Sequence, residues 1–155
     1  SALDGSGFEL WRSDGTSSGT VMVRDIWSGS YPSSPNNLTN VNGTLYFVAY
    51  DVSTGSELWK SDGTAAGTGL VQDIVVGQGS SGAASLLHVN GTLFFAANDG
   101  VTGRELWKTT GATVPTLLTN DVVEFRNEPQ VISHVSEILA KFDKLILSEH
   151  AQLVN

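Results

Sequence analysis

The chain has 155 residues, of which 40% are hydrophobic and only 15% are charged. Acidic residues outnumber basic ones by 16 to 8, so the net charge is −8 and binding to nucleic acid is not expected. The absence of cysteine excludes disulfides and a cysteine nucleophile, and no apolar run approaches the roughly 18 residues of a membrane span.

A motif recurs along the chain at a constant interval. It begins at Glu9 as ELWRSDGTSSGTVMVRDI, at Glu57 as ELWKSDGTAAGTGLVQDI, and at Glu105, in a degenerate form, as ELWKTTGATVPTLL, so successive copies are equally spaced. A second segment, VNGTLYFVAYD from Val41, returns as VNGTLFFAAND from Val89 after the same interval. Two independent markers with one spacing identify a tandem repeat.

Each repeat predicts four short strands. In the central copy these are residues 43–50, 56–60, 68–74 and 85–89, separated by turn sequences such as Asn42-Gly43. Residues 43–50 are apolar on both alternating sides, which is typical of a strand covered on both faces. Four strands within one repeat interval match a β-propeller blade. A β-solenoid is the alternative architecture.

We therefore predict an all-β array of tandem repeats in residues 1–120, with a partial blade in 1–41, a full repeat in 42–89 and a degenerate terminal repeat in 90–120. A propeller closes with about four or more blades. We therefore expect the chain to be a piece of a longer protein, or to have its blades completed by other copies.

Residues 121–155 have a different period. Their apolar residues recur at intervals of four and three, which predicts an amphipathic helix in this C-terminal tail. The stripe consists of Val131, Val135, Ile138, Phe142 and Leu145. We expect it to form an interface, either with the open face of the last blade or with the helix of a second copy.

The motif also carries a resemblance to a known family. With ELW at 9–11 before DGT at 14–16, and ELW at 57–59 before DGT at 62–64, the chain resembles the ELWxxDGT-repeat family of large bacterial surface and secreted proteins. The third copy matches in ELW alone, and the resemblance covers about residues 1–118. It implies propeller-type architecture and a location outside the cell or at its surface, and it brings no general catalytic activity.

Residues that recur at equal spacing are best explained as scaffold. A tryptophan repeated at one blade position indicates packing, with sugar stacking beside the motif glutamate as the alternative. The aspartate of SDGT can bond backbone amides two or three residues on, while the following glycine takes a positive φ. These scaffold residues are Trp11, Trp59, Trp107, Asp14, Asp62, Gly15 and Gly63.

Trp27 departs from the repeat, because the residue at the equivalent position of the next copy is Val75. A tryptophan outside the repeated pattern is either a local packing residue or an exposed, adhesive one. The loop that carries Trp27 and Tyr31 is therefore the candidate binding surface, with surface glycans or proteins as its partners.

Two turns carry paired carboxylates. Asp51 with Glu57, and Asp99 with Glu105, lie six residues apart, and calcium suits such oxygen ligands. The spacing is neither that of an EF-hand nor that of a nonapeptide calcium repeat, so we expect plain hairpin turns and no cofactor.

The sequence has no spacing typical of a nucleophilic or metal-dependent hydrolase. We therefore expect a non-catalytic extracellular module for binding, adhesion or structural assembly at a bacterial cell surface. The alternative is the scaffold fragment of a secreted carbohydrate-active or calcium-dependent enzyme.

Overall fold

The computed structural model describes residues 7–112 and 114–118. The chain divides into two compact units, Ser1–Leu117 and Leu118–Asn155, and every described strand lies in the first. The described residues are all-β: they form antiparallel strands and contain no helix. No helix long and apolar enough to cross a membrane is therefore found among them. The predicted C-terminal helix, with its stripe from Val131 to Leu145, lies outside the described residues.

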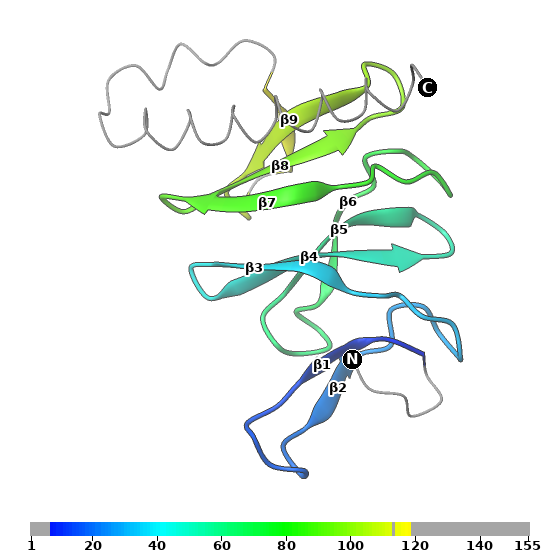
Figure 1. The fold of residues 1–155 in the computed structure, drawn as a ribbon, viewed down its shortest axis with the longest axis vertical. Coiled ribbons are helices and arrows are strands. Elements are labelled where there is room, and N and C mark those ends of the chain that lie inside the picture. Colours follow the sequence, from blue (N-terminus) through cyan, green and yellow to red (C-terminus); the bar gives the residue numbers. More distant parts are fainter. Residues whose placement is uncertain (1–6, 113, 119–155) are drawn as a thin grey trace, which may run out of the picture. The chain divides into compact units, whose positions relative to one another are not determined.

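The strands form three antiparallel sheets (Figure 1). The first sheet contains β1 (Leu10–Arg12) and β2 (Val21–Arg24). The second contains, in chain order, β3 (Asn36–Val41), β4 (Thr44–Asp51), β5 (Gly55–Ser61) and β6 (Gly69–Gln72). The third contains, again in chain order, β7 (Ala84–Val89), β8 (Thr92–Asn98), β9 (Arg104–Thr109) and β10 (Thr116–Leu117).

The sheets are offset by one strand from the sequence repeat. The strand expected at 85–89 is found as β7, but it pairs with β8 of the third sheet rather than with the strands before it. The reason is the two-residue turn Asn90-Gly91, whose φ angles of 47° and 81° suit a hairpin that pairs the strands it joins. Asn42-Gly43, at 51° and 88°, pairs β3 with β4 in the same way. Residues 1–41 therefore supply a strand to the second sheet as well as two to the first.

β4 is buried on both sides, as its sequence predicts. Phe47 lies in one buried cluster with Leu10 of the first sheet, whereas the next residue, Val48, lies in another with Phe95 of the third sheet. Successive side chains of a strand point to opposite faces, so the second sheet packs against both neighbours. Full burial of a phenylalanine such as Phe47 contributes about 2–3 kcal/mol to the free energy of folding.

Candidate functional site

The glutamate of the ELW motif is buried and holds the loop that leads from one sheet to the next. Glu57 of β5 is 0% exposed and accepts a hydrogen bond of 2.8 Å from the Ser81 amide. The Ser81 carbonyl in turn accepts a hydrogen bond of 2.9 Å from the amide of Asn98 in the third sheet. Glu9 and Ser33 repeat the first contact at 2.9 Å in the preceding copy. These two glutamate–serine clasps, Glu9–Ser33 and Glu57–Ser81, fix the loops between the sheets.

Burial governs the ionisation of Glu57. Desolvation raises its pKa above the ordinary value for glutamate, and hydrogen bonds from Ser81, Ile74 and Val75 oppose that increase. Its Oε2 atom nevertheless has no partner within hydrogen-bond distance and angle. Because the carboxylate faces the loop amides inside the protein, it is an internal acceptor that no solvent-borne ligand reaches.

Glu105 differs from both of its counterparts, because it is exposed. The position one repeat after Ser81 lies outside the described residues, so the clasp is described for the first two copies alone. The equal spacing of the ELW motif gave no sign of this difference in burial.

The repeated tryptophans differ in exposure. Trp59 and Trp107 are only 6% and 8% exposed, and each lies in a buried cluster between sheets. The Trp107 indole N–H donates a hydrogen bond of 3.2 Å to the Ala97 carbonyl. Trp11 is half-buried. Neither Trp59 nor Trp107 therefore presents a ring face to a ligand.

The SDGT segments form two matching turns. Asp62 Oδ1 accepts hydrogen bonds from the amide and the hydroxyl of Thr64, at 2.9 and 2.7 Å, and Asp14 makes the same pair of bonds to its own threonine. The threonine hydroxyl is the main cause that lowers the pKa of each aspartate. The next residues, Gly15 and Gly63, have φ of 93° and 89°. The aspartates are thus occupied by their own turns.

The carboxylates proposed as calcium ligands are also used locally. Asp51 accepts a hydrogen bond of 2.9 Å from the Ser53 amide, and Asp99 accepts bonds of 2.8 and 2.7 Å from the amides of Val101 and Thr102. The glutamates predicted to act with them lie in different environments, because Glu57 is buried and Glu105 is exposed. Within residues 7–112 and 114–118, no group of three potential metal-ligating side chains is found.

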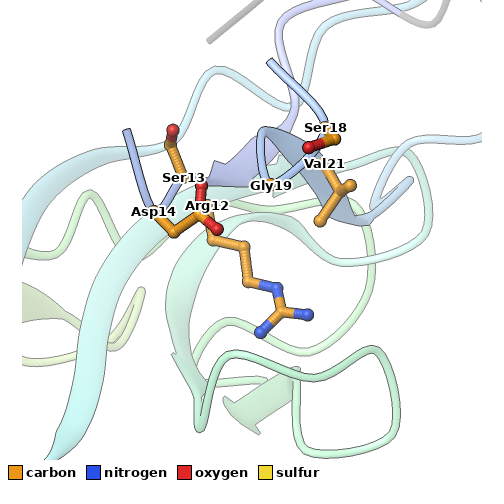
Figure 2. A pocket seen from close by; sticks show the side chains of 6 residues that line it. All are labelled: Arg12, Ser13, Asp14, Ser18, Gly19 and Val21. Atoms are coloured by element: carbon orange, nitrogen blue, oxygen red, sulfur yellow. The ribbon is translucent and has the colours of Figure 1, made fainter. Parts of the chain in front are cut away.

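A pocket of about 240 Å³ lies beside the first SDGT turn (Figure 2). Figure 2 shows the Arg12 side chain extending away from the turn, with Val21 and Ser18 across from it. The lining residues are Arg12, Ser13, Asp14, Ser18, Gly19 and Val21, all from one hairpin. Because Asp14 is already bonded within the turn, we assign no ligand to this pocket.

Three aromatic side chains meet at a second surface. The rings of Trp27 and Tyr31 are stacked, with centroids 4.8 Å apart and planes at 15°, and the ring of Tyr50 lies 4.8 Å from that of Trp27 at 43°. Tyr31 is 58% exposed, whereas Trp27 and Tyr50 are half-buried. Since one face of Tyr31 lies on Trp27, that face does not carry its exposed area. We call Trp27, Tyr31 and Tyr50 the aromatic cluster.

The next copy of the repeat has none of these rings. The residues at the equivalent positions are Val75, Gly79 and Asn98. The backbone beneath is nevertheless the same, because the amides of Tyr50 and Asn98 donate equivalent hydrogen bonds of 2.8 and 2.9 Å to the clasp serines. The scaffold is therefore built without the aromatic cluster in that copy.

Sequence reasoning found Trp27 and Tyr31 but missed Tyr50. The pattern of β4 explained Tyr50 as one more apolar position of a buried strand. The available signal was its counterpart, Asn98, which is polar. Tyr50 therefore departs from the repeat in the same way as Trp27.

The described residues define an all-β protein of antiparallel sheets. The sequence matches no family model, and no curated protein or solved structure matches it significantly. Functional conclusions therefore depend on the residues themselves.

Proposed function

We propose that the chain is a non-catalytic module of propeller-type blades that acts at a bacterial cell surface by binding through the aromatic cluster. The observation that carries this proposal is that Trp27, Tyr31 and Tyr50 gather at one place where the next copy folds with Val75, Gly79 and Asn98. Aromatic side chains are enriched at recognition surfaces. Rings that the scaffold does not require are free to serve that purpose.

Blade architecture is supported by strand order. β3 to β6 and β7 to β10 are each four-stranded antiparallel sheets whose strands follow one another in chain order, which is the topology of a propeller blade. A solenoid of stacked parallel coils is disfavoured, because all the pairings among the described strands are antiparallel. Other copies, or the remainder of a longer chain, would complete the array.

A location outside the cell is supported by the resemblance to the ELWxxDGT-repeat family. The non-catalytic character is supported by the way the repeated carboxylates are used. Glu9 and Glu57 hold the loops between sheets, and Asp14 and Asp62 hold their own turns. Each of these acidic groups has a structural task.

The test is binding to an array that carries bacterial cell-envelope fractions, glycans and surface proteins. Trp27→Val introduces the residue of the next copy and should abolish binding while leaving the circular dichroism spectrum unchanged. Val76→Ala is the matched control, because Val76 is 90% exposed in the corresponding loop of the next copy. The proposal fails if the wild type binds nothing on the array, or if Trp27→Val binds as tightly as the wild type.

A further inference from the structure

The exposed part of the aromatic cluster is small and has two chemical characters. Tyr31 is 58% exposed with one ring face on Trp27, and the hydroxyls of Tyr31 and Tyr50 form no hydrogen bond with any described residue. A flat apolar face with polar atoms at its edge matches a pyranose ring, which has C–H groups on its face and hydroxyls around its edge. The two phenols supply donors beside the stacking face.

The chain between Trp27 and Tyr50 is polar and uncharged, and Asp25 and Asp51 flank it. Residues 27–50 contain no Asp, Glu, Lys, Arg or His. The loop from Ser28 to Asn37 supplies four serines and two asparagines, whereas Asn40 and Asn42 lie at the other end of the β3–β4 hairpin from Tyr50. Most of these side chains are exposed. Hydroxyls and amides suit a neutral ligand rich in hydroxyl groups, whereas the net charge of −8 disfavours phosphorylated or acidic polymers.

A protein partner fits this surface less well. A stable protein interface buries about 800 Å² on each side and has an apolar centre. In the loop from residue 25 to 35, Tyr31 is the one exposed large hydrophobic side chain, and it lies between Ser30 and Pro32. One ring with hydroxyl and amide neighbours accommodates a single sugar unit rather than a broad apolar patch.

We propose that the aromatic cluster binds a neutral polysaccharide, with the free face of Tyr31 stacked on one pyranose ring. The hydroxyls of Tyr31 and Tyr50 and the neighbouring serine and asparagine side chains bind the sugar hydroxyls, and Trp27 holds the two tyrosines in place. This inference rests on the binding function proposed above and names the ligand class.

The experiment is affinity electrophoresis of the full chain in native gels that contain xylan, galactomannan, laminarin or hydroxyethylcellulose. We expect at least one polymer to retard the wild type. Tyr31→Ala should weaken that binding about tenfold, the loss expected when one well-packed aromatic contact is removed. Tyr31→Phe keeps the stacking face and should lose less. Since Tyr31 is 58% exposed, neither change should lower the melting temperature appreciably.

The triple variant Trp27→Val, Tyr31→Gly and Tyr50→Asn converts the cluster into the residues of the next copy and should abolish retardation, while Val76→Ala should not. The inference is wrong if none of the four polymers retards the wild type, or if Tyr31→Ala is retarded as strongly as the wild type. Trp27-dependent binding to a surface protein, without retardation by any polymer, overturns the carbohydrate inference but leaves the binding function intact. If the wild type binds neither a polymer nor a surface protein, the carbohydrate inference and the proposed binding function are both wrong.

Discussion

The glutamate–serine clasp predicts that equivalent glutamates of the motif contribute very differently to stability. Glu57→Ala removes the acceptor of the 2.8 Å hydrogen bond from the Ser81 amide, and that amide belongs to a residue only 1% exposed. A hydrogen bond to a charged group contributes about 1.5–3 kcal/mol, and a buried N–H left without a partner costs about 1–3 kcal/mol. Removal of a desolvated carboxylate offsets part of this loss.

We expect a net destabilisation of about 3 kcal/mol, which lowers the melting temperature of a unit of this size by about 10 °C. Glu105→Ala is the matched control, because it makes the same change at the same position of the motif on an exposed side chain. A surface substitution of this kind should change the free energy of unfolding by less than about 0.5 kcal/mol.

The assay is urea unfolding followed by circular dichroism, combined with thermal unfolding, for the wild type and both variants. If the clasp holds the loop between the second and third sheets, Glu57→Ala alone shifts the transition. Equal shifts for the two variants, or a larger one for Glu105→Ala, would refute the reasoning, because burial and the Ser81 hydrogen bond would then not determine the outcome.

Three further outcomes are expected. Gly55→Ala should lower the free energy of unfolding by more than about 3 kcal/mol and Gly103→Ala by about 1 kcal/mol. Both glycines have positive φ, but a Cβ at Gly55 would lie 1.9 Å from the Gly79 carbonyl oxygen, whereas a Cβ at Gly103 would have nothing within 4 Å. Similar decreases for the two variants in urea unfolding would contradict this expectation. Burial raises the pKa of Glu57, so folding favours its protonated form. The part of its contribution that depends on protonation is complete below the unfolded-state pKa and is lost as pH rises through the folded-state pKa, while the hydrogen bond from the Ser81 amide remains. The advantage of the wild type over Glu57→Gln in urea unfolding should therefore shrink as pH rises above the ordinary pKa of glutamate, and a widening gap would disprove it. Calcium and chelator should give melting temperatures within about 1 °C, whereas a clear rise with calcium would reinstate a metal site.

Local signals explain how much of the fold could be predicted from the sequence. The strands of the central copy were predicted within a few residues of β4, β5, β6 and β7, because alternating apolar residues and Asn-Gly turns act over short distances. Their grouping into sheets was missed, because a tandem repeat has no natural starting point in the sequence. The hairpin at Asn90-Gly91 determines the grouping, because this turn pairs β7 with β8.

The aromatic cluster was predictable in part for a different reason. Trp27 and Tyr31 belong to one loop, so proximity in sequence already placed them together. Tyr50 comes from the end of β4, and its contact with Trp27 exists only because the loop folds back against that strand through the Ser33 carbonyl and the Tyr50 amide. A pattern read within one strand cannot reveal a contact between separate segments.

Departures from the repeat have two physical meanings in this chain. Glu105 is exposed where Glu9 and Glu57 are buried, so in this copy the motif glutamate is not a buried scaffold group. Trp27 and Tyr31 stand where the next copy has smaller side chains, and here the departure adds ring surface while the backbone hydrogen bonds are unchanged. The difference in burial between Glu57 and Glu105 predicts a difference in the effect of mutation on stability. The added rings of Trp27 and Tyr31 predict an effect of mutation on binding with no change in stability. Unfolding and binding measurements therefore distinguish the two kinds of departure, and each copy of the repeat supplies the control substitution for its neighbour.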